Sequence, residues 1–534
     1  MTSARPPFHR ILVANRGEIA VRIIRASHEL GMEAVAVYSD ADVGAQHVRM
    51  ADIAVRLGPA APAESYLRIE AILEAATTTD AEAIHPGYGF LSERATFARA
   101  VEDAGFIFVG PSAGVIEALG DKVHARRLAR SVDVPGVPGT VAPVAVDRPD
   151  ELPAILAEAD RIGFPLLVKA AAGGGGRGMR RVAAAADLPA ALAAGSAEAA
   201  SAFGDGSVFL EREIRPARHI EVQLLGDASG RVVAIGERDC SLQRRHQKLI
   251  EEAPAPGLSS DQRADLHELA VRVGSAAGLT NAATAEFLRA PDGAFYFLEV
   301  NTRLQVEHGV SELVGGVDIV QEQFRLAAGE DLSEAALAAA ARATDPDGHA
   351  IEVRLAAEDP SAEFGPGPGR IRRWVMPSGP GVRVDTGFGV GDRVPPDYDN
   401  LVAKIMVHAV DRPAAIDRLR RALDETEVAG VQTTLPFHRF VARHPGFRDA
   451  ELSTDWVAEN WDGPAERSRY AETAGKAAAR AVAAGDVTTD PGRATVDRDP
   501  ADGWRRPGTS GPVIPADGGW VATARGDAVD RWPR

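Results

Sequence analysis

Residues 283–308 read ATAEFLRAPDGAFYFLEVNTRLQVEH, and this stretch decides both the fold and the chemistry. Two alternating segments around an Ala-Pro-Asp-Gly turn predict the strands of a hairpin. A symmetric loop would place Glu286 opposite Phe297, with Glu299 as the diagonal neighbour on the same face. Two carboxylates and the nearby amide of Asn301 are hard oxygen ligands, so the hairpin predicts a Mg²⁺ site beside nucleotide phosphates. A solvated polar face is the alternative, which the aromatic residues of the second strand disfavour.

The segment that follows the hairpin carries a second polar set. If residues 301–308 are extended, Arg303, Gln305 and Glu307 share one face. A fixed cation, an amide and a carboxylate together can hold and deprotonate a small oxyacid. Alone the pattern also fits an ordinary polar strand, but its position beside the acidic hairpin favours a site.

A glycine-rich loop lies upstream, in residues 169–179 (KAAAGGGGRGM), after a predicted strand at 166–169. Glycines let backbone N–H groups approach phosphate oxygens closely. The loop is not a Walker A motif, because no Gly-Lys-Ser/Thr follows. Flanking by Lys169 and Arg177 favours phosphate binding over a flexible hairpin tip.

A basic segment, Gln243–Lys248, follows a predicted strand at 231–236. Alternation would place Arg244, His246 and Lys248 on one side, where they could face an anion; a surface basic run is the usual explanation for such a segment. Lysine is rare in this arginine-rich chain, and three of its five lysines fall in the motifs described here. A compact ammonium is hard to replace by a guanidinium. The five are Lys122, Lys169, Lys248, Lys404 and Lys476.

Composition limits the class of protein. A chain of 534 residues predicts three to four structural units. The net charge of −17 disfavours nucleic-acid binding and an anionic membrane surface. The single cysteine, Cys240, excludes an intrachain disulfide, suits a reducing cytoplasm and is expected to be a small buried side chain rather than a nucleophile. We expect no signal peptide and no membrane-spanning segment.

The order of predicted elements favours an α/β protein. A strand at 8–14, a helix at 19–30 and a strand at 34–38 predict a small parallel sheet without a dinucleotide fingerprint. A second unit covers about 112–330, with an insertion at 141–211 that has Ala-rich helices and suits a mobile lid. A third unit covers about 349–455, and the remainder is rich in Ala, Gly and Pro, with a helix expected at 467–484.

Taken together, these motifs resemble biotin carboxylase, the ATP-grasp component of biotin-dependent carboxylases, and most of all the alpha subunits of acyl-CoA carboxylases. The resemblance covers about residues 8–456. It rests on Asn15–Ala20, His85–Glu93, Gly120–Lys122, the glycine loop, Glu237–Pro256, Glu299–Glu307 and Gly348–Pro360. It implies an N-terminal Rossmann-like parallel-sheet domain (1–118), an ATP-grasp domain (119–335, lid about 141–211), a C-terminal mixed-sheet domain (345–456) and a partly disordered tail (457–534).

The resemblance also implies an activity. Bicarbonate attacks the ATP γ-phosphate to give carboxyphosphate, and the carboxyl group then passes to biotin. The implied cofactors are ATP, Mg²⁺ (or Mn²⁺) and a biotin supplied by a separate carrier. The implied partners are a biotin carboxyl carrier protein and a carboxyltransferase subunit, in a homodimeric or larger cytoplasmic complex.

The same resemblance assigns site residues. It implies ATP contacts at Lys122, Lys169, Gly175, Gly176, Glu211, Arg212, Ile214, His219, Gln243, His246, Glu286 and Glu299, and metal ligation by Glu286, Glu299 and Asn301. Bicarbonate and biotin are assigned to Lys248, Arg303, Gln305, Val306, Arg354 and Tyr88. Lys248, Arg303, Glu307 and Arg354 are the implied catalytic residues, with Glu307 as base and Arg354 stabilising the biotin enolate.

Three positions depart from the family pattern: Arg212 replaces a common lysine, Gly309 a proline and Ala356 an asparagine. No Ala-Met-Lys-Met-like biotinylation site is present, so the chain is expected to act on an external carrier. Two alternatives remain at this point. One is an ATP-grasp ligase for another carboxylate, and the other is a non-catalytic homologue in a carboxylase complex.

Overall fold

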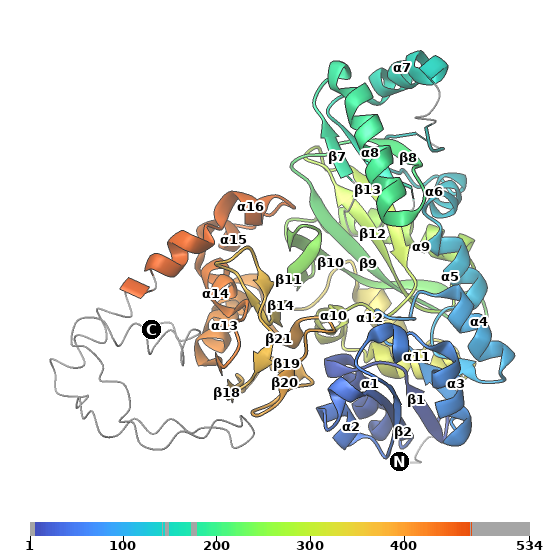
Figure 1. Ribbon diagram of the computed structural model, residues 1–534, viewed down its shortest axis with the longest axis vertical. Coiled ribbons are helices and arrows are strands. Elements are labelled where there is room, and N and C mark those ends of the chain that lie inside the picture. Colours follow the sequence, from blue (N-terminus) through green and yellow to red (C-terminus); the bar gives the residue numbers. More distant parts are fainter. Residues whose placement is uncertain (1–5, 141, 145–148, 172–178, 470, 473–534) are drawn as a thin grey trace.

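The computed structural model describes residues 6–140, 142–144, 149–171, 179–469 and 471–472. Figure 1 shows the N-terminal elements at the bottom, a large sheet in the middle, a small lobe at the top and the C-terminal elements on the left. Within the described residues, no helix is both long and apolar enough to cross a bilayer.

The N-terminal part is a parallel sheet between helices, as the strand–helix–strand pattern predicted. All of its pairings are parallel, in the order β3-β2-β1-β4-β5. Ile11, Leu12 and Val13 of β1 are fully buried, because helices cover both faces of the sheet. The strands are β1 (Arg10–Val13), β2 (Glu33–Ser39), β3 (Ile53–Gly58), β4 (Ala83–His85) and β5 (Ile107–Phe108); the helices are α1 (Gly17–Glu29), α2 (Gln46–Met50), α3 (Ile69–Thr78) and α4 (Ala95–Asp103).

The central sheet has eight strands in the order β13-β12-β9-β10-β11-β14-β21-β19, and every pairing in it is antiparallel. The predicted strand at 231–236 is the start of a longer one. The strands are β9 (Arg218–Gly226), β10 (Val232–Arg244), β11 (Gln247–Ala253), β12 (Asn281–Arg289), β13 (Phe295–Asn301), β14 (His349–Ala356), β19 (Val382–Thr386) and β21 (Leu401–Ala409). The helices around it are α5 (Ala113–Gly120), α6 (Lys122–Ser131), α9 (Ser260–Ala276), α10 (His308–Gly315), α11 (Ile319–Ala327) and α12 (Glu334–Arg342).

The predicted acidic hairpin exists as β12 and β13, but the predicted register is wrong. Glu286 pairs directly with Glu299, and Phe287 pairs with Phe297. An irregularity between these two pairs leaves Leu298 as an extra residue on β13. The bulge brings the two carboxylates opposite each other, where the symmetric loop had made them diagonal neighbours.

The insertion predicted as a lid forms a small lobe with its own core. Its sheet has the order β7-β6-β8, and Ile155, Val168, Leu192 and Leu210 pack together inside it. Two helices cover this sheet, as predicted from the Ala-rich stretches (Figure 1). The elements are β6 (Leu166–Ala170), β7 (Met179–Val182), β8 (Val208–Arg212), α7 (Leu152–Ile162) and α8 (Leu188–Phe203). The glycines of the loop at 172–178 lie outside the described residues.

The C-terminal part adds three strands, β14, β21 and β19, to one edge of the central sheet instead of closing a separate sheet. Three two-stranded ladders and the helices α13 to α16 complete it. These are β15 (Glu358–Asp359), β16 (Gly365–Pro366), β17 (Gly369–Arg370), β18 (Arg373–Val375), β20 (Arg393–Val394), β22 (Glu427–Ala429), α13 (Arg412–Glu425), α14 (Leu435–Arg443), α15 (Pro445–Arg448) and α16 (Trp456–Asn460).

The ends of two later helices are defined to different extents. Ser333 caps α12, because its side chain accepts a hydrogen bond from the N–H of Ala336. The helix expected at 467–484 is described only at its start, where residues 463–469 are helical. The partly disordered tail expected at 457–534 lies mostly outside the described residues.

Candidate active site

One cavity of about 1190 Å³ lies where the N-terminal part, the central sheet, the lid lobe and the C-terminal part meet. It gathers most of the predicted site residues, although they come from distant parts of the chain. Its lining includes Tyr88, Lys122, Lys169, Glu211, Arg212, Ile214, His219, Gln243, His246, Lys248, Glu286, Glu299, Asn301, Arg303, Gln305, Val306 and Arg354. Gly175 and Gly176 lie outside the described residues. Glu307 is fully buried behind the lining.

A row of charged residues crosses four neighbouring strands on the floor of the cavity. Glu286 of β12 pairs with Glu299 of β13 on one side and with Glu221 of β9 on the other. Glu221 in turn pairs with Arg238 of β10, and their side chains form a fully buried ion pair of 2.5 Å. Three carboxylates side by side repel each other unless cations lie among them, so this row needs positive charge beyond Arg238.

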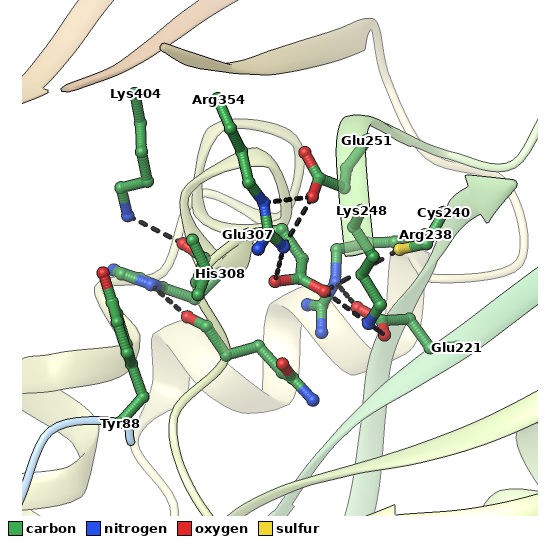
Figure 2. Close-up of polar contacts among 12 residues, drawn as sticks. Tyr88, Glu221, Arg238, Cys240, Lys248, Glu251, Glu307, His308, Arg354 and Lys404 are labelled. Carbon is green, nitrogen blue, oxygen red and sulfur yellow. Dashed lines mark hydrogen bonds and ion pairs between the residues drawn. The ribbon is translucent and has the colours of Figure 1, made fainter. Parts of the chain in front are cut away.

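Lys248 supplies that charge. Its ammonium lies 3.0 Å from Glu286 Oε1. It also lies 2.7 Å from Glu307 Oε1 and donates to Glu221 (Figure 2). Burial alone would lower the pKa of Lys248, but the three carboxylates override it and raise that pKa well above its usual range. Lys248 is therefore a permanent cation with an exposed fraction of only 11%.

Glu307 lies at the start of α10, where it is the N-terminal flanking residue of the helix. The prediction that residues 301–308 are extended is wrong, because the chain turns after Asn301 and enters α10 at His308. The turn still assembles the predicted set. Arg303 donates to the side chain of Gln305 at 2.9 Å, and Glu307 contacts Lys248.

Cations on both sides control the ionisation of Glu307. Its Oε2 accepts a hydrogen bond of 2.9 Å from Arg354 Nη2, while Oε1 faces Lys248 (Figure 2). Burial would raise the pKa of Glu307, but Lys248, Arg354 and Arg238 hold it well below the usual range. Glu307 is thus ionised at neutral pH and able to accept a proton.

The paired carboxylates on the hairpin suit a divalent cation. Glu286 and Glu299 lie opposite each other, and Asn301 Nδ2 donates to Glu286 Oε1 at 2.8 Å, so all three side chains converge. Two carboxylates and an amide oxygen would leave further octahedral positions for phosphate oxygens and water, as Mg²⁺ prefers. Lys122 Nζ lies 3.3 Å from Glu299 Oε2, where it can also face a phosphate.

A second group of cations lines the cavity beside the lid lobe. Lys169 of β6 and Arg126 of α6 both form ion pairs with Glu211, which is 1% exposed. Burial would raise the pKa of Glu211, but these two cations lower it. Glu211 therefore fixes a lysine and an arginine at the cavity wall, which is a suitable surface for nucleotide phosphates.

The basic segment only partly follows its prediction. Gln243, His246 and Lys248 line the cavity, but Arg244 points elsewhere, with its guanidinium 4.9 Å from the ring centre of Phe364. The strand ends at Arg244, and a turn with positive φ at Arg245 and His246 breaks the alternation. Because the period-2 pattern stops at the turn, the three basic residues do not share a face.

Sequence reasoning missed three carboxylates that hold the predicted cations. Glu221 binds Lys248 and Arg238, Glu93 lies 3.0 Å from Arg303 Nε, and Glu251 accepts a hydrogen bond of 2.6 Å from Arg354 Nε. Glu221 lies two residues after His219 on the same strand, and that spacing was a usable signal. Glu93 and Glu251 carry no local signal, because their partners are distant in sequence.

Two further predicted residues have defined environments. The hydroxyl of Tyr88 donates to Glu18, and burial raises the pKa of Tyr88 well above its usual range. Cys240 is fully buried, as expected, with its Sγ 3.8 Å from Glu307 Oε1. Burial raises the pKa of this thiol well above its usual range, so Cys240 is not an ionised nucleophile.

Glycine at position 309, where the family pattern has proline, is explained by the position of Met406. Gly309 is the second residue of α10, and a Cβ placed there would lie 2.3 Å from Met406 Sδ. Met406 is fully buried on β21. Glycine at 309 and methionine at 406 therefore fit together immediately behind Glu307.

A parallel-sheet N-terminal part, a central antiparallel sheet with a separate lid lobe, and cations and carboxylates converging between them define an ATP-grasp ligase. Family models agree along the chain. Residues 7–116 match the biotin carboxylase N-terminal domain, 121–335 the ATP-binding domain of the carbamoyl-phosphate synthase L chain, and 352–459 the biotin carboxylase C-terminal domain.

Similar proteins point the same way. The chain is 48% identical over 438 residues to the biotin carboxylase of Pseudomonas aeruginosa, covering 82% of this chain and 95% of the relative. It is 46% identical over 461 residues to the biotin-dependent acyl-coenzyme A carboxylase alpha3 subunit of Mycobacterium leprae, covering 86% and 75%. The crystal structure of Campylobacter jejuni biotin carboxylase in an ATP complex has a TM-score of 0.80 at 42% identity, covering 85% and 99%.

The chain belongs to the biotin carboxylase family. It is an ATP-grasp ligase that carboxylates biotin at the expense of ATP, as the resemblance implied. Solved relatives hold the implied small molecules: an ATP complex in the Campylobacter jejuni biotin carboxylase, and MgADP with bicarbonate in the biotin carboxylase domain of the Hydrogenobacter thermophilus 2-oxoglutarate carboxylase. Relatives include a subunit of a biotin-dependent acyl-coenzyme A carboxylase, and the chain also matches 40% of the Rhizobium etli pyruvate carboxylase chain.

Proposed function

We propose that this chain catalyses the first half-reaction of an acyl-CoA carboxylase, with the residue roles that follow. The observation that carries the proposal is the contact of Glu307 with both Lys248 and Arg354 behind the cavity wall. One carboxylate thereby touches the cation suited to bicarbonate and the cation suited to biotin. The proposed division of the chain is 1–118, 119–335 and 345–456, which agrees with the matched ranges.

Bicarbonate binds between Lys248 and Arg303, with Gln305 and the backbone of Val306 beside it. Both cations line the cavity, so a small oxyanion can reach them. When bicarbonate takes part of the charge of Lys248, the hold of Lys248 on Glu307 weakens, and the affinity of Glu307 for a proton rises. Glu307 then removes the bicarbonate proton, and the resulting dianion attacks the γ-phosphorus of ATP.

ATP lies along the lid edge and the acidic hairpin. Lys122, Lys169, Gln243 and His246 are suited to contact it, and Glu211 fixes Lys169. The proposed metal ligands are Glu286, Glu299 and Asn301, which hold Mg²⁺ (or Mn²⁺); the ion neutralises phosphate charge when it is bound. The remaining proposed ATP contacts are Gly175, Gly176, Arg212, Ile214 and His219.

Arg354 stabilises the negative charge on the ureido oxygen of biotin when N1 loses its proton to the phosphate released from carboxyphosphate, and N1 then takes the carboxyl group. Its exposed fraction is 19%, and it lines the cavity near Tyr88. Carboxyphosphate is labile in water, so closure of the lid lobe over the cavity would protect it.

The proposed partners are a biotin carboxyl carrier protein and a carboxyltransferase subunit, in a cytoplasmic complex built on a homodimer or larger assembly. The alpha3 subunit of the mycobacterial acyl-CoA carboxylase is the relative that favours an acyl-CoA system. A non-catalytic homologue would be expected to lack a metal ligand, the base or a cation, whereas Glu286, Glu299, Glu307 and Arg354 are all present in this chain.

The test measures ADP formation by the purified chain with ATP, Mg²⁺ and bicarbonate, with and without free D-biotin. We expect biotin to stimulate ADP formation, and Glu307→Gln to lower the bicarbonate-dependent rate by about 10²-fold or more. No stimulation by biotin in the wild type would refute the proposed acceptor. A fully active Glu307→Gln variant would refute the role of Glu307 as base.

A further inference from the structure

Two carboxylates hold the Arg354 guanidinium, and they have different roles in the proposed reaction. Its Nε donates to Glu251 Oε1 at 2.6 Å, and its Nη2 donates to Glu307 Oε2 at 2.9 Å (Figure 2). Glu307 is the proposed base, so it takes up a proton during the cycle and its hold on Arg354 weakens. Among the described residues, the contact with Glu251 is then the remaining side-chain anchor of the guanidinium.

Glu251 lies behind Arg354 as seen from the cavity. Its side chain is fully buried and does not line the cavity, whereas Arg354 does, and unlike Glu307 it forms no hydrogen bond or ion pair with Lys248 among the described residues. Its other oxygen, Oε2, is buried with no hydrogen-bond partner among the described residues. The hydrogen-bonded route from Glu251 to the cavity therefore runs through Arg354, while its charge also acts through space on Glu307 and Lys248.

We propose that Glu251 is the positioning residue for the biotin step: it keeps the Arg354 guanidinium aimed at the biotin ureido oxygen while Glu307 is protonated. This inference rests on the proposed role of Arg354. It predicts a larger effect on the biotin step than on the bicarbonate step, because within the described residues the Glu251 side chain has a direct hydrogen bond to Arg354 and no hydrogen bond or ion pair to Lys248, the hairpin or the lid cations.

The position of the anchor comes from sheet pairing. Glu251 of β11 lies directly across from Glu352 of β14, two residues before Arg354 on the same face of that strand. Burial raises the pKa of Glu251 to about 7, and Arg354 opposes that rise. Whether ionised or protonated, Oε1 can still accept the hydrogen bond from Nε, so the geometric hold persists in both forms.

The chain contains a matched control in the next residue. Glu252 is also a buried carboxylate that binds an arginine, since Arg412 Nε lies 2.7 Å from its Oε2. Successive residues of a strand point to opposite faces, and Glu252 binds His349 and Arg412 away from the cavity. Replacement of Glu252 therefore measures how much a buried ion pair on β11 contributes to stability when Arg354 is not involved.

The experiment compares wild type, Glu251→Ala, Glu251→Gln and Glu252→Gln for bicarbonate-dependent ADP formation without biotin and for the increment caused by free D-biotin. For Glu251→Ala we expect the biotin increment to fall about 10²-fold through kcat, with KM for biotin and the biotin-free rate changed less than about 3-fold. Glu251→Gln keeps an acceptor oxygen and should recover most of the increment. Glu252→Gln should melt earlier but keep the wild-type ratio of the two rates.

Three results would overturn the inference. In Glu251→Ala the two rates could fall together, as general loss of structure would cause, or the biotin increment could be unchanged. Glu251→Gln could also be as impaired as Glu251→Ala, which would exclude a geometric hold. A wild type that biotin does not stimulate would instead refute the proposed function, so the two failures are distinguishable.

Discussion

Replacement of Gly309 by alanine should displace Glu307, the proposed base, although Glu307 itself is unchanged. Gly309 follows Glu307 by two residues at the start of α10, and the added Cβ would lie 2.3 Å from Met406 Sδ. Non-bonded heavy atoms pack at about 3.5–4.0 Å, so either Met406 or the start of α10 must move by more than about 1 Å. Met406 is fully buried and packs with Val310 of α10 and with an alanine each of β11 and β14, so we expect the helix start to share the movement.

The size of the effect follows from this overlap. Overpacking of a core position costs about 1–3 kcal/mol of folding free energy. A misplacement of about 1 Å at a catalytic group can cost about 10²-fold in rate. Gly309→Ala should therefore melt at a lower temperature, and its bicarbonate-dependent ADP formation should fall by about 10-fold to 10²-fold.

A second substitution supplies the control. Met406→Val removes the sulfur that the new Cβ would meet, at the cost of a small cavity. In the double variant Gly309→Ala/Met406→Val, the activity should be higher than in Gly309→Ala, with a coupling energy of about 1 kcal/mol or more. Wild-type activity and melting in Gly309→Ala, or simple additivity in the double variant, would refute the packing argument.

Other predictions concern the charged groups. Lys248→Met leaves three buried carboxylates without their shared cation, so we expect a loss of about 3–5 kcal/mol in unfolding free energy, by chemical denaturation, and ADP formation at least about 10²-fold slower. Glu286→Gln should raise the Mg²⁺ concentration needed for half-maximal ADP formation, while an unchanged Mg²⁺ titration would contradict its role as a ligand. The pKa of Glu252 is lowered to about 2, because His349 and Arg412 outweigh the effect of burial. A carboxyl group whose pKa is lower in the folded state than in the unfolded chain stabilises the fold at pH values above the unfolded pKa. About 3 kcal/mol of unfolding free energy should therefore be lost as the pH falls from about 4.5 to about 2. Glu252→Gln should be less stable at pH 7 and should show a smaller stability loss on acidification; equal acid sensitivity of variant and wild type would contradict this assignment.

The sequence was most informative where chemistry depends on local spacing. Glu286, Glu299 and Asn301 were assigned to one site from strand alternation, and the structure brings all three together. The predicted pairing was nevertheless wrong, because a bulge near Leu298 depends on packing that a spacing rule does not contain. The same limit explains Arg244, which a turn with positive φ removes from the cavity.

Sequence spacing could not identify residues whose partners are distant in the chain. Glu251 and Arg354 are far apart in the chain, and only the pairing of β11 with β14 places them together. The sequence also did not reveal that the antiparallel central sheet extends into the C-terminal part. The residue pattern of a strand is the same whether the strand starts a separate sheet or adds to an existing one. The family resemblance located the residues, and the structure supplied their partners.

The pairing of β11 with β14 also limits how this enzyme can be divided and recombined. The polypeptide passes from the ATP-binding part to the C-terminal part near residue 340, but the hydrogen-bonded sheet does not stop there. A fragment that ended before β14 would leave β11 as a bare edge with unpaired backbone groups, open to self-association. Chimaeras with related ligases should therefore exchange the two parts as one block, and evolution by domain shuffling would have met the same restriction.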